Sequence, residues 1–238
     1  MNDDKEIKDI ITKYFNSKNC DVIEIPVSKI ETPDLLVTIE ELKVIIEIKS
    51  KLPSVKQSDK TISIERIERK AKYLKAAQKS SKQMNSFSKD EVKYKILWLD
   101  CGNIDPELHF HNYRYTLFGI KLCQPLNSSK IKEGFYITHS DFYKYRDKID
   151  GAIISCTNEI FFYVNNYSNN YEEIKEGKLK KALPQPFDVI EEDKKGSIYL
   201  ADFDVDRDNE LDIQKALSKK YGFEAMFLIT PNSIIEKI

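Results

Sequence analysis

The residues best suited to chemistry lie on two short apolar runs that follow each other closely. Asp34 precedes the first run, and Glu47, Ile48 and Lys49 end the second. Because side chains alternate along a strand, Glu47 and Lys49 should point to one face and Ile48 to the other. A tight turn at Glu40-Glu41 would pair residues whose numbers sum to about 81, which sets Asp34 opposite Glu47. We therefore expect two carboxylates and one ammonium on a single face of a sheet.

This set of groups suits a hard divalent cation. The carboxylates of Asp34 and Glu47, with the backbone carbonyl of Ile48, are ligands typical of Mg²⁺ (or Mn²⁺), which keeps several of its waters. Such a cation lowers the pKa of a bound water and polarises a phosphoryl oxygen. Lys49 can orient that water or offset the charge that develops on phosphorus. The pattern indicates metal-assisted hydrolysis of a phosphodiester.

Apolar periodicity predicts the elements that must position these residues. The order is helix, strand, hairpin, helix, strand, with a polar loop at 52–61 between the hairpin and the second helix. The predicted ranges are a helix at 3–17, strands at 22–27, 35–39 and 42–48, a helix from 62 to about 84, and a strand at 94–100.

Pro33-Asp34 and Glu47-Ile48-Lys49, with the apolar residues 35–37 and 44–46 beside them, resemble the PD-(D/E)xK nuclease superfamily. The resemblance covers roughly residues 1–102 and is closest to the hairpin of Holliday-junction resolvases and restriction enzymes. It implies a restriction-endonuclease-like core, of α/β class, with a mixed central sheet flanked by helices. It also implies metal binding by Asp34 and Glu47 and a catalytic role for Lys49.

The same resemblance points to two supporting residues. Many members carry a further Glu on the first helix, where Glu6 is the candidate; Asp3 and Asp9 compete with it, and Glu24 on the first strand is another candidate. Acids in a first turn are also expected from the helix dipole alone. Some relatives place a Gln or Lys near the metal on the second helix, where Gln78 lies on the stripe that we expect to face inward.

The net charge of −1 conceals a polarised chain. Residues 49–95 carry 14 basic and 5 acidic side chains, net +9, and the segments on either side each carry net −5. A local basic patch of this kind attracts a polyanion, so we expect DNA as the partner. The alternative is a solvated helix face. The proposed phosphate contacts are Arg66, Arg69, Lys70, Lys72, Lys75 and Lys79.

The rest of the chain alternates between strands and helices, without an internal repeat. An Asn- and Ser-rich turn cluster at 165–170 predicts a boundary, giving a nuclease-like domain at 1–165 and a small C-terminal α/β extension at 166–238. The predicted elements beyond residue 102 are strands at 115–123, 152–156, 160–164, 197–203 and 224–229, and a helix at about 209–221.

Several other patterns favour plain structural roles. His109 and His111 alternate as on a strand but have no third ligand nearby. The acidic run 204–208 resembles the start of a calcium loop, but Asn209 stands where such a loop needs Gly, so we expect a helix cap. No apolar run approaches the ~20 residues of a membrane span. Four scattered cysteines favour reduced thiols and hence a cytoplasmic protein.

The sequence thus predicts a metal-dependent endodeoxyribonuclease, with restriction or phage defence as the biological setting. Cutting both strands usually needs two active sites, so we expect a homodimer, and residues 166–238 would serve target choice, oligomerisation or a protein partner. The alternative is a catalytically inactive nuclease-fold module that binds nucleic acid or a protein. RNA as the substrate also stays open.

Overall fold

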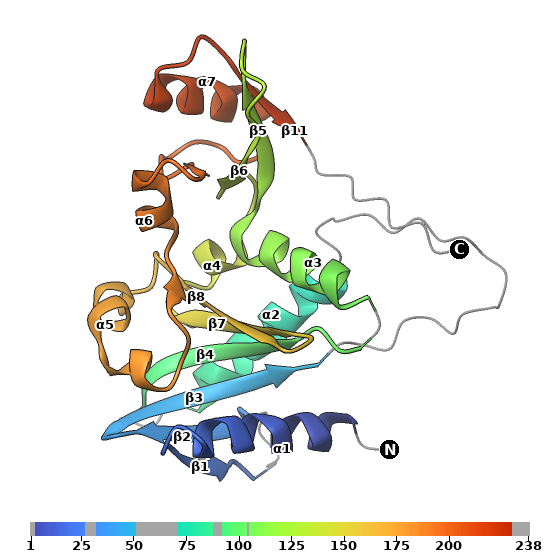
Figure 1. The fold of residues 1–238 in the computed structure, drawn as a ribbon, viewed down its shortest axis with the longest axis vertical. Helices are drawn as coiled ribbons and strands as arrows, with labels where there is room; N and C mark the ends of the chain where they lie inside the picture. Colours follow the sequence, from blue (N-terminus) through green and yellow to red (C-terminus); the bar gives the residue numbers. More distant parts are fainter. Residues whose placement is uncertain (1–2, 27–31, 51–70, 88–91, 104, 230–238) are drawn as a thin grey trace, which may run out of the picture.

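The computed structural model describes residues 3–26, 32–50, 71–87, 92–103 and 105–229 (Figure 1). Within them the chain forms an α/β structure around a mixed seven-stranded sheet, in the order β1-β2-β3-β4-β7-β8-β9. The central strands β3, β4 and β7 are parallel, whereas β1-β2, β2-β3 and β7-β8 are antiparallel. The strands are β1 Asp21–Glu24, β2 Leu35–Ile39, β3 Leu42–Lys49, β4 Val92–Asp100, β7 Gly151–Cys156, β8 Glu159–Val164 and β9 Pro186–Phe187.

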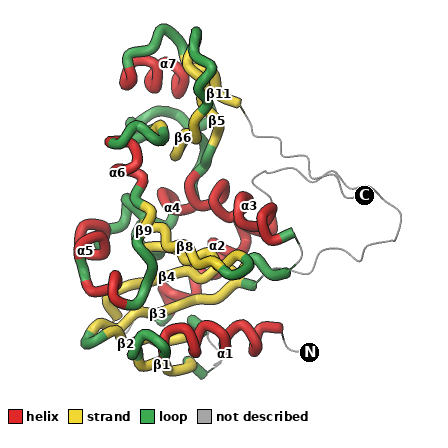
Figure 2. The backbone as a smooth tube through the Cα atoms, in the orientation of Figure 1, coloured by secondary structure: helices red, strands yellow, loops and turns green. Residues whose placement is uncertain are grey.

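Helices cover both faces of this sheet (Figure 2). α1 (Asp3–Asn16) packs Ile11 and Phe15 on one face, in a core shared with Ile46 of β3. α2 (Ala71–Ser86) and α3 (Pro106–Phe118) cover the other face, whose core includes Ile45 of β3. Because odd- and even-numbered residues of β3 alternate between these cores, Glu47 lies on the α2–α3 side with Ile45.

A second sheet lies at the far end of the molecule from α1 (Figure 1). Its order is β10-β6-β5-β11, and α7 packs on it through Ile213 and Leu217. The remaining elements are β5 Lys121–Pro125, β6 Lys132–Phe135, α4 Asp141–Lys144, α5 Tyr171–Glu176, a 3₁₀ turn at Lys178–Lys181, α6 Val189–Lys194, β10 Tyr199–Leu200, α7 Glu210–Tyr221 and β11 Met226–Ile229.

The two sheets do not divide at residue 165, where the sequence predicts a boundary. The second sheet takes β5 and β6 from before that point, and the first sheet takes β9 from after it. The described residues after 165 therefore do not form a sheet of their own, because strands from both halves of the chain complete each sheet. Sequence periodicity identifies the strands but does not show which sheet each one joins.

Two predicted segments beyond residue 102 are wrong, and both fall on α3. His109 and His111 lie on this helix rather than on a strand, and the predicted strand 115–123 begins only at Lys121. Gly119 ends the helix with a left-handed φ of 62°, and its N–H donates to the carbonyl of Tyr115. α3 buries side chains around most of its circumference, so its apolar residues show no helical stripe.

The other predictions in this half are confirmed or shortened. The strands predicted at 152–156, 160–164 and 224–229 and the helix at 209–221 correspond to β7, β8, β11 and α7, while 197–203 contains only the two-residue β10. Asn209 caps α7 by accepting a hydrogen bond from the N–H of Asp212, which confirms the helix-cap interpretation of that acidic run.

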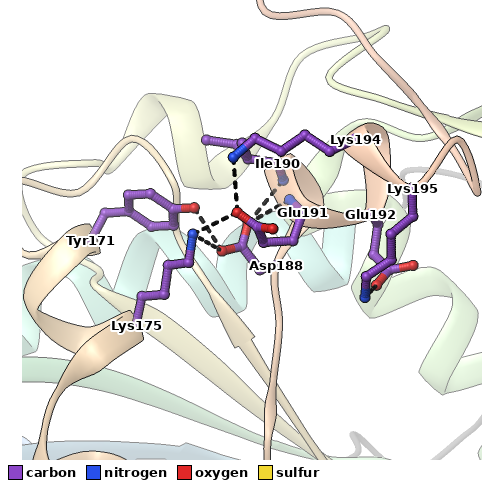
Figure 3. Close-up of polar contacts among 8 residues, drawn as sticks. All are labelled: Tyr171, Lys175, Asp188, Ile190, Glu191, Glu192, Lys194 and Lys195. Atoms are coloured by element: carbon purple, nitrogen blue, oxygen red, sulfur yellow. Dashed lines mark hydrogen bonds and ion pairs between the residues drawn. The ribbon is translucent and has the colours of Figure 1, made fainter.

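A buried carboxylate fixes the segment that connects the two sheets (Figure 3). Asp188, between β9 and α6, caps α6 by accepting from the N–H groups of Ile190 and Glu191. Its other oxygen accepts from the hydroxyl of Tyr171 on α5 at 2.7 Å, and the Lys175 ammonium lies 3.4 Å away. Asp188 therefore joins α5 to α6 at the point where the chain leaves the first sheet.

We predict that Asp188→Ala lowers the free energy of unfolding by about 1–2 kcal/mol, because it removes a helix cap and leaves the buried Tyr171 hydroxyl without its partner. Lys194→Ala is the matched control: it breaks only an exposed ion pair with Glu191 and should change stability by under about 0.5 kcal/mol. Urea denaturation of both variants measures this. Equal effects would contradict the role given to Asp188.

Candidate active site

The hairpin forms with the predicted register. Leu35 pairs with Ile46 and Val37 with Val44, so opposite residues sum to 81. Asp34 lies one residue before this ladder. Its N–H donates to the carbonyl of Ile46 at 3.2 Å, and its Oδ2 accepts from the N–H of Ile48 at 2.9 Å. The backbone groups that Asp34 bonds belong to the residues immediately before and after Glu47. These two bonds therefore hold the carboxylate of Asp34 next to that of Glu47.

Glu47 is the most constrained group of the site. Its side chain is 0% exposed, although it lies on the carboxyl end of a parallel strand. One oxygen, Oε1, accepts from the Lys49 ammonium, while Oε2 has no hydrogen-bond partner among the described residues. Burial raises the pKa of Glu47 to about 7; the charge of Lys49 opposes this rise, and the carboxylate of Asp34 adds to it.

Lys49 is held from two sides. Besides Glu47, it donates to the Oε1 atom of Gln83 on α2 at 3.1 Å, and the amide of Gln83 donates in turn to the carbonyl of Thr32 at 3.2 Å. Gln83 therefore connects α2, the lysine and the segment that leads into Asp34. This arrangement aims the ammonium at the carboxylates rather than into solvent.

The glutamine of this helix that reaches the site is Gln83, not Gln78, which the sequence predicts. Gln78 is exposed and does not line the site. The described helix begins at Ala71, and its buried side chains are Tyr73, Ala77, Ser80, Ser81 and Met84, so Gln78 does not lie on the inward face. The part of the predicted helix before Ala71 lies outside the described residues. Ala76, Lys79 and Gln83 share the face of this helix that lines the pocket, beside the face that Tyr73, Ala77 and Met84 bury.

The first helix contributes the ammonium of Lys8 to the site rather than the predicted carboxylate of Glu6. Glu6 is exposed and lines a separate hollow with Tyr14 and Trp98. Lys8 instead reaches the site, with its ammonium 2.5 Å from Asp34 Oδ1. Among the described residues the expected third carboxylate is thus absent, and a lysine lies next to the first one.

These groups line a pocket of about 460 Å³ between the hairpin, α2 and α3. Tyr73, His109 and Tyr113 form an aromatic wall, in which the Tyr73 hydroxyl lies 2.5 Å from His109 Nδ1. His109 therefore belongs to the wall of the candidate site, which sequence analysis did not foresee because it places the residue on a strand.

Part of the predicted basic face reaches the same pocket. Lys75 and Lys79 are exposed and line it. Arg66, Arg69 and Lys70 lie outside the described residues, and of Lys72 the structure describes only the backbone, on α2. The described part of the patch thus lies beside the carboxylates.

The donor set fits a divalent cation that keeps most of its waters. Within the described ranges no group of three His, Cys, Asp or Glu side chains converges, so the site offers two carboxylates rather than a closed cage. The buried, unpartnered Oε2 of Glu47 is the observation that supports such a cation, because an oxygen of this kind needs either a proton or a positive partner. Ile48 as a carbonyl ligand stays a prediction.

Comparisons with protein-family models, with curated proteins and with solved structures found no match. None of the helices in the described part of the chain is long and apolar enough to cross a membrane.

We predict that, without metal, the protein loses stability as pH rises from 5 to 7.5. Because the pKa of Glu47 is about 7 in the folded protein and near its ordinary 4.5 when unfolded, the proton favours the folded state between these values. Glutamine does not titrate, so the free energy of unfolding of Glu47→Gln should rise relative to that of wild type by on the order of 2 kcal/mol between pH 5 and 7.5. Denaturant titrations in EDTA at both pH values measure the difference. Glu159→Gln, an exposed carboxyl on β8, should show no such gain.

Proposed function

We propose that this protein is a metal-dependent endodeoxyribonuclease of the PD-(D/E)xK superfamily, with a restriction-endonuclease-like core. The support is the hairpin that carries Asp34, Glu47 and Lys49, set in the order α1-β1-β2-β3-α2-β4 that the resemblance implies. The observation that carries the proposal is the buried Glu47, whose Oε2 has no cationic or N–H partner among the described residues and which lines, with Asp34, a pocket that also contains lysines.

Asp34 and Glu47 would hold Mg²⁺ or Mn²⁺, with the carbonyl of Ile48. When bound, the cation supplies an activated water and polarises the scissile phosphate. The two carboxylates would fix it, and the burial of Glu47 would strengthen that attraction by excluding bulk water. The two positive charges of one divalent cation would offset the two carboxylates, so the lysines that line the pocket would leave it suited to a phosphate anion.

We assign to Lys49 the role of orienting the attacking water. Gln83 and Glu47 hold its ammonium on the carboxylate side of the pocket. From there it can orient a water by hydrogen bonding and offset negative charge as the bond to phosphorus forms. Gln83 acts through Lys49 and is a positioning residue.

DNA is the proposed substrate. Lys75 and Lys79 lie at the pocket and belong to the segment that carries net +9, so phosphates on both sides of the cleaved bond would find cationic partners. Restriction or phage defence is the proposed setting, and a homodimer would supply the second active site that double-strand cleavage requires.

One observation favours the second candidate, a nuclease-fold module that binds nucleic acid without cutting it. Each carboxylate already has a lysine partner, Lys8 for Asp34 and Lys49 for Glu47. A site neutralised in this way needs no metal for its charge balance. Measured cleavage separates this candidate from the nuclease.

We predict Mg²⁺-dependent cleavage of DNA that falls by at least about 10²-fold in Asp34→Asn, Glu47→Gln and Lys49→Met, since each removes a charged group at the reacting phosphate. Gln83→Ala should reduce the rate less, by about tenfold, because Lys49 keeps its charge but loses one of its two anchors. Gln78→Ala, on the exposed side of the same helix, is the control and should cut like wild type.

The assay uses single-stranded, duplex and branched DNA with RNA of the same sequence, in Mg²⁺ and in EDTA. Wild-type activity surviving in Asp34→Asn and Lys49→Met would refute the assignment. Binding of DNA without cleavage under every metal condition would favour the binding module.

A further inference from the structure

Asp34 is held by a cation that comes from the helix on the opposite face of the sheet. The Lys8 ammonium lies 2.5 Å from Asp34 Oδ1, and the two side chains are 23% and 20% exposed. The other oxygen of Asp34 accepts from the N–H of Ile48. Both oxygens are therefore engaged, and the one that faces Lys8 carries a full ionic partner.

Lys49 has the same relation to Glu47, so the site contains two carboxylates and two ammonium groups. A divalent cation held by both carboxylates would place its charge against two lysines at short range. Lys49 is held by Gln83 as well and keeps a partner when the cation binds. Within the described part of the chain the Lys8 ammonium has a single ion-pair partner, Asp34, so Lys8 is the cation whose interaction a metal directly opposes.

We infer that Lys8 and the metal ion are mutually exclusive partners of Asp34 Oδ1, so that Lys8 sets the metal concentration at which the site loads. This inference rests on the proposed metal site. It assigns to α1 a role opposite to that of the expected Glu6: the helix supplies a competitor for the metal rather than a ligand.

Once released from Asp34, Lys8 can bind a DNA phosphate in the same pocket. Lys8 lines the pocket together with Lys75 and Lys79, where a DNA phosphate would lie. A phosphate there attracts the Lys8 ammonium and so frees Asp34 for the metal. Metal and DNA then bind cooperatively, and by thermodynamic linkage each raises the affinity of the other by the same factor.

The experiment is calorimetric titration of Mn²⁺ into the full chain. Lys8→Met should bind Mn²⁺ about three- to tenfold more tightly than wild type, the effect of removing a partly buried ion pair and a nearby positive charge. Lys8→Arg keeps the charge and should stay within about twofold of wild type. Lys5→Met, an exposed lysine on the same helix, is the control for position and should change nothing.

A second titration adds a single-stranded phosphorothioate oligonucleotide, which resists cleavage. In wild type the oligonucleotide should tighten Mn²⁺ binding several-fold. In Lys8→Met most of that gain should disappear, because Asp34 is already free. Circular dichroism checks the fold of each variant, and Lys8→Gln replaces Lys8→Met if the latter does not fold.

The outcomes separate the inference from the proposed function. If wild type and Lys8→Met both bind no Mn²⁺, the metal site and the nuclease proposal fail together with the inference. If wild type binds Mn²⁺ and the Lys8 variants bind it with the same affinity, the inference alone is overturned. Tighter binding in Lys8→Met but not in Lys8→Arg or Lys5→Met supports it.

Discussion

The candidate site depends on one constraint: a carboxylate, Glu47, is buried at the carboxyl end of β3 in the main sheet. An apolar side chain there would cost nothing, whereas an ionised carboxylate loses its hydration and needs partners. The structure supplies one, the ammonium of Lys49, and leaves the second oxygen without any among the described residues. The energetic deficit at that oxygen is what a bound cation would remove.

The surrounding elements can be understood from this constraint. The hairpin brings Asp34 to Glu47 through backbone bonds on either side of it. α2 holds Lys49 through Gln83, and α1 holds Asp34 through Lys8. Elements from both helical layers thus meet at the carboxyl end of β3. Charge is balanced locally in this structure, and the pocket beside it stays open to a ligand.

How much of this the sequence predicts depends on how local each feature is. The hairpin follows from period-two alternation and a tight turn, and its register is confirmed. The pairing of two carboxylates can therefore be predicted without tertiary contacts.

The inward face of a helix, in contrast, depends on tertiary contacts. α2 presents Gln83 to the site rather than Gln78, because packing of Tyr73, Ala77 and Met84 sets its rotation about the helix axis. Lys8 and Asp34 are distant in sequence and belong to different layers, so no spacing rule connects them. α3 hides its period because it is buried on several sides.

The measurement that tests the central claim most directly is a crystal structure of the protein soaked in Mn²⁺, with anomalous difference maps. We predict a peak between the carboxylates of Asp34 and Glu47, with Lys8 withdrawn from Asp34. Crystals that show no anomalous peak there at millimolar Mn²⁺, with both lysines still on their carboxylates, would contradict it.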